Sequence, residues 1–77
     1  MLNAITLEIE RHLAENRGAA DSAEGIRAWW LPARMRGVPL EHVIEALERL
    51  KDAGVVKKTQ VGVGYVYGAA PGTPTRH

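Results

Sequence analysis

The sequence predicts a small α+β domain that is mainly helical, with three helices followed by a two-stranded β-hairpin. Apolar residues recur at helical spacing in three segments of residues 3–53, and Gly or Pro separates the segments. After Gly54 the composition changes to β-branched and aromatic residues, which favours strands. We expect one domain over residues 1–68 and a flexible tail over residues 69–77.

The first helix is predicted over residues 3–16, within the segment NAITLEIERHLAENRG. One stripe of apolar residues predicts its buried side: Leu2, Ile5, Ile9 and Leu13. Leu7 and Ala14 lie on the opposite side, where they are candidates for a homodimer contact.

The second helix is predicted over residues 22–30. Asp21 is expected to cap it, since Glu24 follows at the spacing of a capping box. Pro32 discourages its continuation into the connector LPARMRGV.

Two adjacent tryptophans end this helix, and they cannot fill the same space because successive helical residues diverge by about 100°. Trp30 lies on the same side as Ile26 and is predicted to be core. Trp29 projects to the flank, which leaves two interpretations. It is either partly buried under the connector or an anchor that faces a binding partner.

The third helix is predicted over residues 40–53, between Pro39 and Gly54. Helical spacing predicts that its core side consists of Leu40, Val43, Ala46, Leu47 and Leu50. Its outward side carries only acidic residues, Glu41, Glu45, Glu48 and Asp52. Ile44 lies on the rim, either as the edge of the core or as the start of an interface patch.

The hairpin is predicted over residues 55–67, with a turn at residues 61–64. Val61 and Val63 are expected to be exposed at its tip. Tyr65 and Tyr67 share one strand face and are expected to pack back on the helices.

The junction ALERLKDAGVVKK and the hairpin TQVGVGYVYG resemble the third helix and the wing of winged helix-turn-helix proteins. The resemblance covers about residues 3–68 and implies a three-helix domain with a two-stranded wing. It implies either DNA binding or protein assembly, since the fold serves both. The connector of about eight residues is longer than the tight turn of DNA-reading members.

The sequence favours a non-enzymatic protein-interaction or assembly module, whose candidate partner-binding residues are Trp29, Arg27, Arg34, Arg36 and Ile44. The alternative is a transcriptional regulator that contacts the phosphates of double-stranded DNA through Arg27, Arg34, Arg36, Lys57 and Lys58. The acidic third helix argues against this alternative, because a duplex would repel it.

Other classes of function lack sequence support. The net charge is +1, and residues 55–77 carry three basic and no acidic residues. Three scattered histidines and no cysteine predict neither a metal site nor a cofactor. We expect no catalytic residues and no membrane segment. The absence of cysteine fits a cytoplasmic location.

Overall fold

The computed structural model describes residues 2–71, without the side chain of Leu2. It is a mostly helical α+β domain, which confirms the predicted class. In chain order the elements are α1 (Leu2–Glu15), β1 (Ala20–Asp21), α2 (Ala23–Gly25), a π-helical turn (Ile26–Trp30), a 3₁₀ turn (Ala33–Met35), α3 (Leu40–Asp52), β2 (Val56–Val61) and β3 (Gly64–Ala69). Most of the predicted tail, residues 72–77, lies outside the described part, whereas Ala69 is the last residue of β3.

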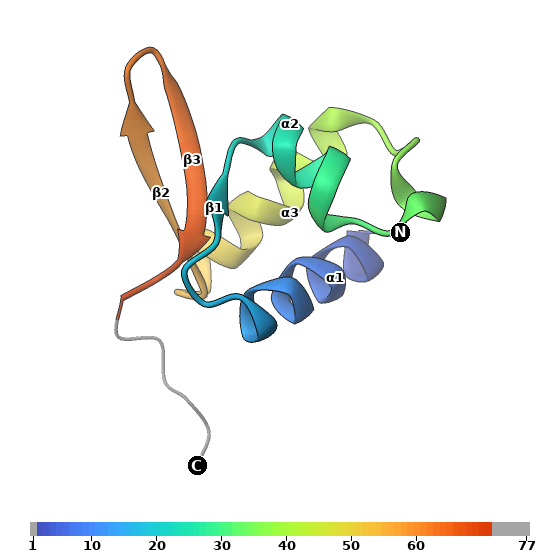
Figure 1. Cartoon of the computed structure of the whole chain (residues 1–77), viewed down its shortest axis with the longest axis horizontal. Coiled ribbons are helices and arrows are strands. Elements are labelled where there is room, and N and C mark those ends of the chain that lie inside the picture. The colour runs from blue at the N-terminus through green and yellow to red at the C-terminus, as the bar shows by residue number, and fades with distance from the viewer. Residues whose placement is uncertain (1, 72–77) are drawn as a thin grey trace.

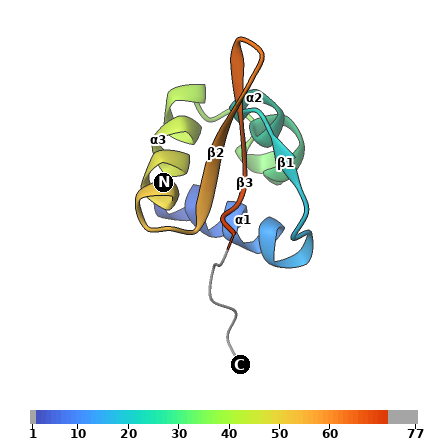
Figure 2. The ribbon, with the colours of Figure 1, turned by 90° about the vertical axis from the view of Figure 1, so that its left-hand side faces the viewer.

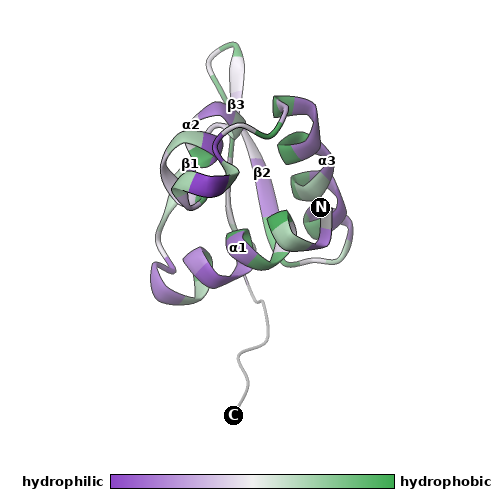
Figure 3. Cartoon of the chain, turned by 90° about the vertical axis from the view of Figure 1, so that its right-hand side faces the viewer, coloured by the Kyte–Doolittle hydropathy of each residue, from purple (hydrophilic) through white to green (hydrophobic). Residues whose placement is uncertain are grey.

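The helices enclose the core on one side of the sheet. α1 lies across one end of the molecule and packs on α3 and the π turn (Figure 1). The hydrophilic sides of α1 and α3 turn outward and their apolar sides turn inward (Figure 3). The core consists of Ile5, Ile9, Leu13, Ile26, Trp30, Leu31, Met35, Val38, Val43, Ala46, Leu47, Leu50, Val56 and Tyr67. The burial of Ile5, Ile9 and Leu13 confirms the predicted apolar stripe of the first helix at these positions. In α3, four of the five predicted core residues are buried, and the fifth, Leu40, is half-buried.

The second helical segment starts one residue later than expected. Ser22 is its N-cap, and its hydroxyl oxygen accepts a hydrogen bond from the Gly25 amide at 3.1 Å. The prediction that Asp21 caps the helix is wrong, because the backbone of Asp21 belongs to β1, where it pairs with Tyr67. The Asp21 carboxylate instead accepts from the Ser22 amide at 2.7 Å.

The sheet has three strands, one more than the two-stranded hairpin that the sequence predicts. Its order is β1-β3-β2, and all pairs are antiparallel. The two residues of β1 are too few to show a period, which is why sequence pattern does not predict this strand. β1 approaches β3 closely at Gly68, where an added Cβ would lie 2.9 Å from the Ala19 carbonyl oxygen.

Two glycines set the path of the hairpin. Gly54 (φ 81°) follows α3, where its amide donates to Lys51 and the Val55 amide donates to Leu50. These two bonds form a Schellman motif, which requires a left-handed residue. Gly62 (φ 61°) opens the predicted two-residue turn between the paired Val61 and Gly64. The tip of the hairpin consequently stands clear of the helices (Figure 2).

We expect Gly68→Ala to lower the free energy of unfolding by about 1–3 kcal/mol, because the new methyl group must push β1 away from β3. Urea denaturation measures this change. Gly64→Ala is the matched control, since an added Cβ at Gly64 meets nothing within 4 Å. Equal stability of the two variants would show that β1 is not held closely on β3.

Candidate functional site

The π turn separates the two tryptophans. The Leu31 amide donates to the Ile26 carbonyl oxygen, five residues back, at 3.3 Å. Trp30 is 9% exposed and belongs to the core, as predicted. Trp29 is 74% exposed, so the interpretation that places it under the connector is wrong. Only the interpretation as an outward-facing side chain remains.

Trp30 has a partner that sequence reasoning does not identify. The imidazole of His12, near the end of α1, stacks on the Trp30 ring with a centroid distance of 4.3 Å and an interplanar angle of 16°. Because the two residues are far apart in the chain, no local spacing predicts the pair. The stack joins α1 to the π turn at the residue that follows Trp29 in the chain.

The connector after Trp30 carries two of the candidate arginines, and it is well packed. Leu31, Met35 and Val38 from this segment are buried in the core. The Arg27 guanidinium donates to the Val38 carbonyl oxygen at 3.4 Å, which links the π turn to the end of the connector.

Arg34 and Arg36 differ in their surroundings. Arg34 lies 3.5 Å from the carboxylate of Glu8 on α1. Arg36 is exposed and takes part in no ion pair among residues 2–71. No cation–π pair joins Trp29 to an arginine within the same range. Among the tryptophan and arginine candidates, Trp29 and Arg36 are therefore exposed without an ion pair or cation–π partner within residues 2–71, whereas Arg34 is exposed beside Glu8.

The outward side of α3 is acidic, as the sequence predicts. Glu41 and Glu45 are exposed, and Glu45 pairs with Arg49 at 3.6 Å one turn along the helix. Such exposed pairs contribute little to stability. This surface repels a phosphate backbone.

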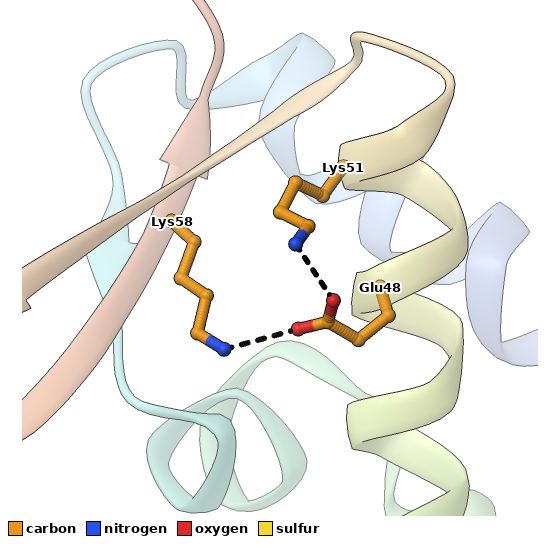
Figure 4. Close-up of polar contacts among 3 residues, drawn as sticks. All are labelled: Glu48, Lys51 and Lys58. Atoms are coloured by element: carbon orange, nitrogen blue, oxygen red, sulfur yellow. Dashed lines mark hydrogen bonds and ion pairs between the residues drawn. The ribbon is translucent and has the colours of Figure 1, made fainter.

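Glu48 differs from the other acidic residues of α3, because two lysines hold its carboxylate. Lys51 lies 2.9 Å from one oxygen and Lys58 of β2 lies 3.2 Å from the other (Figure 4). The Lys51 and Lys58 hydrogen bonds lower the pKa of Glu48 below its ordinary value of 4.5. The Glu48 carboxylate in turn raises the pKa of Lys51 and of Lys58. Lys58 is thus paired within the domain.

The strand face that turns toward the helices carries both tyrosines. Tyr67 is buried, as predicted, but Tyr65 is 48% exposed, so the expectation that it packs on the helices is wrong. It lies further out along the hairpin, and the Lys58 ammonium sits over its ring at 4.4 Å from the centroid. Val61 and Val63 are exposed at the tip, and Lys57 is exposed on the opposite strand face.

Ile44 borders an open groove between α3, the start of α2 and the hairpin. The groove is lined mainly by apolar side chains, among them Leu40, Ile44, Tyr65 and Tyr67, and by Glu24. Ile44 is 38% exposed, which fits its predicted position on the rim of the core side of α3. On the other side of the domain, Leu7 and Ala14 are exposed on α1.

Within residues 2–71, no group of three or more histidine, aspartate or glutamate side chains is arranged to hold a metal ion. None of the helices in this range has the length and apolar character needed to cross a membrane.

Comparisons with family models, with curated proteins and with solved structures found no match for this chain.

We expect the stability difference between the wild type and Glu48→Gln to depend on pH. Since the pKa of Glu48 is lowered in the folded state, its ion pairs stabilise the fold above pH 4.5, and this contribution is lost as the pH falls through the folded-state pKa. The difference in urea midpoint should be largest at neutral pH and should close in acid, once the pH lies below the lowered pKa of Glu48.

Glu45→Gln is the matched control for this titration. It removes an exposed pair on the same helix, and we expect a small difference at every pH. A Glu48→Gln difference that persists unchanged in acid would mean that the two ion pairs are not its source.

Proposed function

We propose that this chain is a winged-helix domain that acts as a non-enzymatic protein-interaction module, with Trp29 as the anchor of its contact surface. The arrangement of the elements supports the first part. Three helical segments precede an antiparallel hairpin, and the hairpin stands beside the third helix. The additional strand β1 joins the first and second helical segments to this hairpin.

The exposure of Trp29 carries the proposal. A tryptophan presents a large apolar surface, and tryptophan is enriched among the residues that dominate binding energies. Trp30 directly after it is buried, so the π turn holds the Trp29 backbone firmly while leaving its side chain accessible. π turns occur frequently at functional sites. The exposed Arg36 adds a cation of the type enriched at interfaces.

The five cations named for DNA binding support the alternative less well. Arg34 and Lys58 face carboxylates of Glu8 and Glu48, and Arg27 donates to a backbone carbonyl. Of these five cations, only Arg36 and Lys57 are exposed and take part in no ion pair among residues 2–71. The acidic outward side of α3 opposes the approach of a duplex.

We expect Trp29→Ala to change the free energy of unfolding by less than about 0.5 kcal/mol. Trp30→Ala should cost about 3–5 kcal/mol, because it leaves a cavity in the core. Chemical denaturation of both variants measures the contrast. A large loss of stability in Trp29→Ala would make it a structural residue and remove the anchor.

We expect Trp29→Ala to abolish partner binding or self-association. The first measurements are sedimentation of the purified protein and quantitative mass spectrometry of proteins retained from extracts of its own cells, each followed by a binary assay with purified partners. Val63→Ala is the matched control, since it removes an exposed apolar side chain at the hairpin tip. A partner that binds both variants equally well would contradict a role for Trp29.

We expect no salt-dependent amide shifts when mixed-sequence duplex DNA is titrated at about 50 mM and then about 200 mM salt, because phosphate-driven binding requires several accessible cations. NMR spectroscopy resolves this for each residue. Shifts at Arg36 and Lys57 that fade at the higher salt would favour the DNA-binding regulator and overturn the proposal.

A further inference from the structure

The groove beside Ile44 is a second surface with properties of its own. Its walls come from three parts of the chain: the start of α2, the first turns of α3 and the hairpin. Ile44 on α3 and Tyr65 on β3 line it as partly exposed apolar side chains, and Leu40 and Tyr67 are its less exposed apolar members. The groove is therefore a preformed apolar surface that is open to solvent.

Two carboxylates lie in or next to the groove. Glu24 lines the groove, and Glu41 lies one helical turn before Ile44 on the neighbouring side of α3. Neither carboxylate has an ion-pair partner among residues 2–71. Arg27 lies three residues after Glu24, but its guanidinium bonds to the Val38 carbonyl oxygen instead.

A cation also lies on the hairpin side of the groove, and a carboxylate pairs with it. Lys58 lies over the Tyr65 ring, and Glu48 pairs with its ammonium group. Glu48 also pairs with Lys51, so its single negative charge offsets one of the two lysines, and the cluster of Glu48, Lys51 and Lys58 keeps a net charge of +1. Two carboxylates stand against this single positive charge: Glu24 in the lining of the groove and Glu41 next to it on α3. The balance of these charges is negative.

We propose that this groove binds a cationic segment of a protein partner, in which a bulky apolar side chain packs between Ile44 and Tyr65 and flanking Lys or Arg side chains pair with Glu24 and Glu41. This inference rests on the proposed role as an interaction module and names a surface distinct from Trp29. A nucleic acid or an anionic membrane does not fit, because the two carboxylates repel phosphates. An apolar groove with a charged rim is typical of peptide recognition.

The test is a selection of random 12-residue peptides displayed on phage against the immobilised full chain. We expect the enriched peptides to carry a large apolar residue next to Lys or Arg and to shift the amides of Leu40, Ile44 and Tyr65 in NMR titrations. Ile44→Glu should weaken their binding at least about tenfold, since it places a charge in the apolar contact. The double variant with Glu24→Gln and Glu41→Gln should weaken binding roughly fivefold or more, with a smaller effect at high salt.

Two controls keep this result separate from the Trp29 proposal. Thermal denaturation must show that Ile44→Glu and the double variant remain folded, which the exposure of all three positions favours. Trp29→Ala should bind the selected peptides as tightly as the wild type.

Several outcomes overturn the groove proposal. They are enrichment of acidic peptides, peptides that bind Ile44→Glu and the double variant unchanged, or no enrichment. Peptides that depend on Trp29 and not on Ile44 overturn it while leaving the interaction module in place. Salt-sensitive shifts with duplex DNA at these same amides overturn both.

Discussion

The burial of Trp30 is the constraint on which the rest of the structure depends. Its ring closes the space between α1, the π turn and the connector, and the imidazole of His12 covers one of its faces. Because the chain contains no phenylalanine and no cysteine, few other side chains supply comparable apolar area. The backbone widens into a π turn at this point, and Leu31 can then enter the core directly after Trp30. Trp29 is exposed as a consequence of where its neighbour is held.

Much of the fold follows from the sequence, because three of its elements have a clear period or a clear terminator. The stripe from Ile5 to Leu13 and the stripe in α3 each place one side in the core, and Gly54 ends α3 in a left-handed conformation. β1 was not predictable, since a two-residue strand has no pattern and exists only because β3 presents Gly68 to it. The π turn was not predictable either, because it depends on packing between elements, which helix propensity does not describe.

The candidate site was predictable in its chemistry but less so in its geometry. Helical spacing identifies the acidic side of α3, and it separates Trp30 from Trp29. Spacing along one element cannot show contacts between elements. The pairing of Lys58 with Glu48 and of Arg34 with Glu8 therefore required the structure, and these pairs reduce the number of cations available to a nucleic acid. Tyr65 was misassigned for a related reason, since an alternating strand pattern does not reveal where the helices beneath it end.

The left-handed conformation of Gly54 also sets the direction in which the hairpin leaves α3. β2 leaves α3 at this residue, and the Ala70 amide closes the base of the hairpin on the Val55 carbonyl oxygen. With a rise of about 3.3 Å per residue, β2 spans about 20 Å, so a rotation of about 10° at its base displaces the tip by roughly 3.5 Å. The Lys58–Glu48 pair lies part-way along this length and ties β2 to α3. A small change of backbone angle at the base of β2 would therefore alter the width of the groove beside Ile44, far from that base.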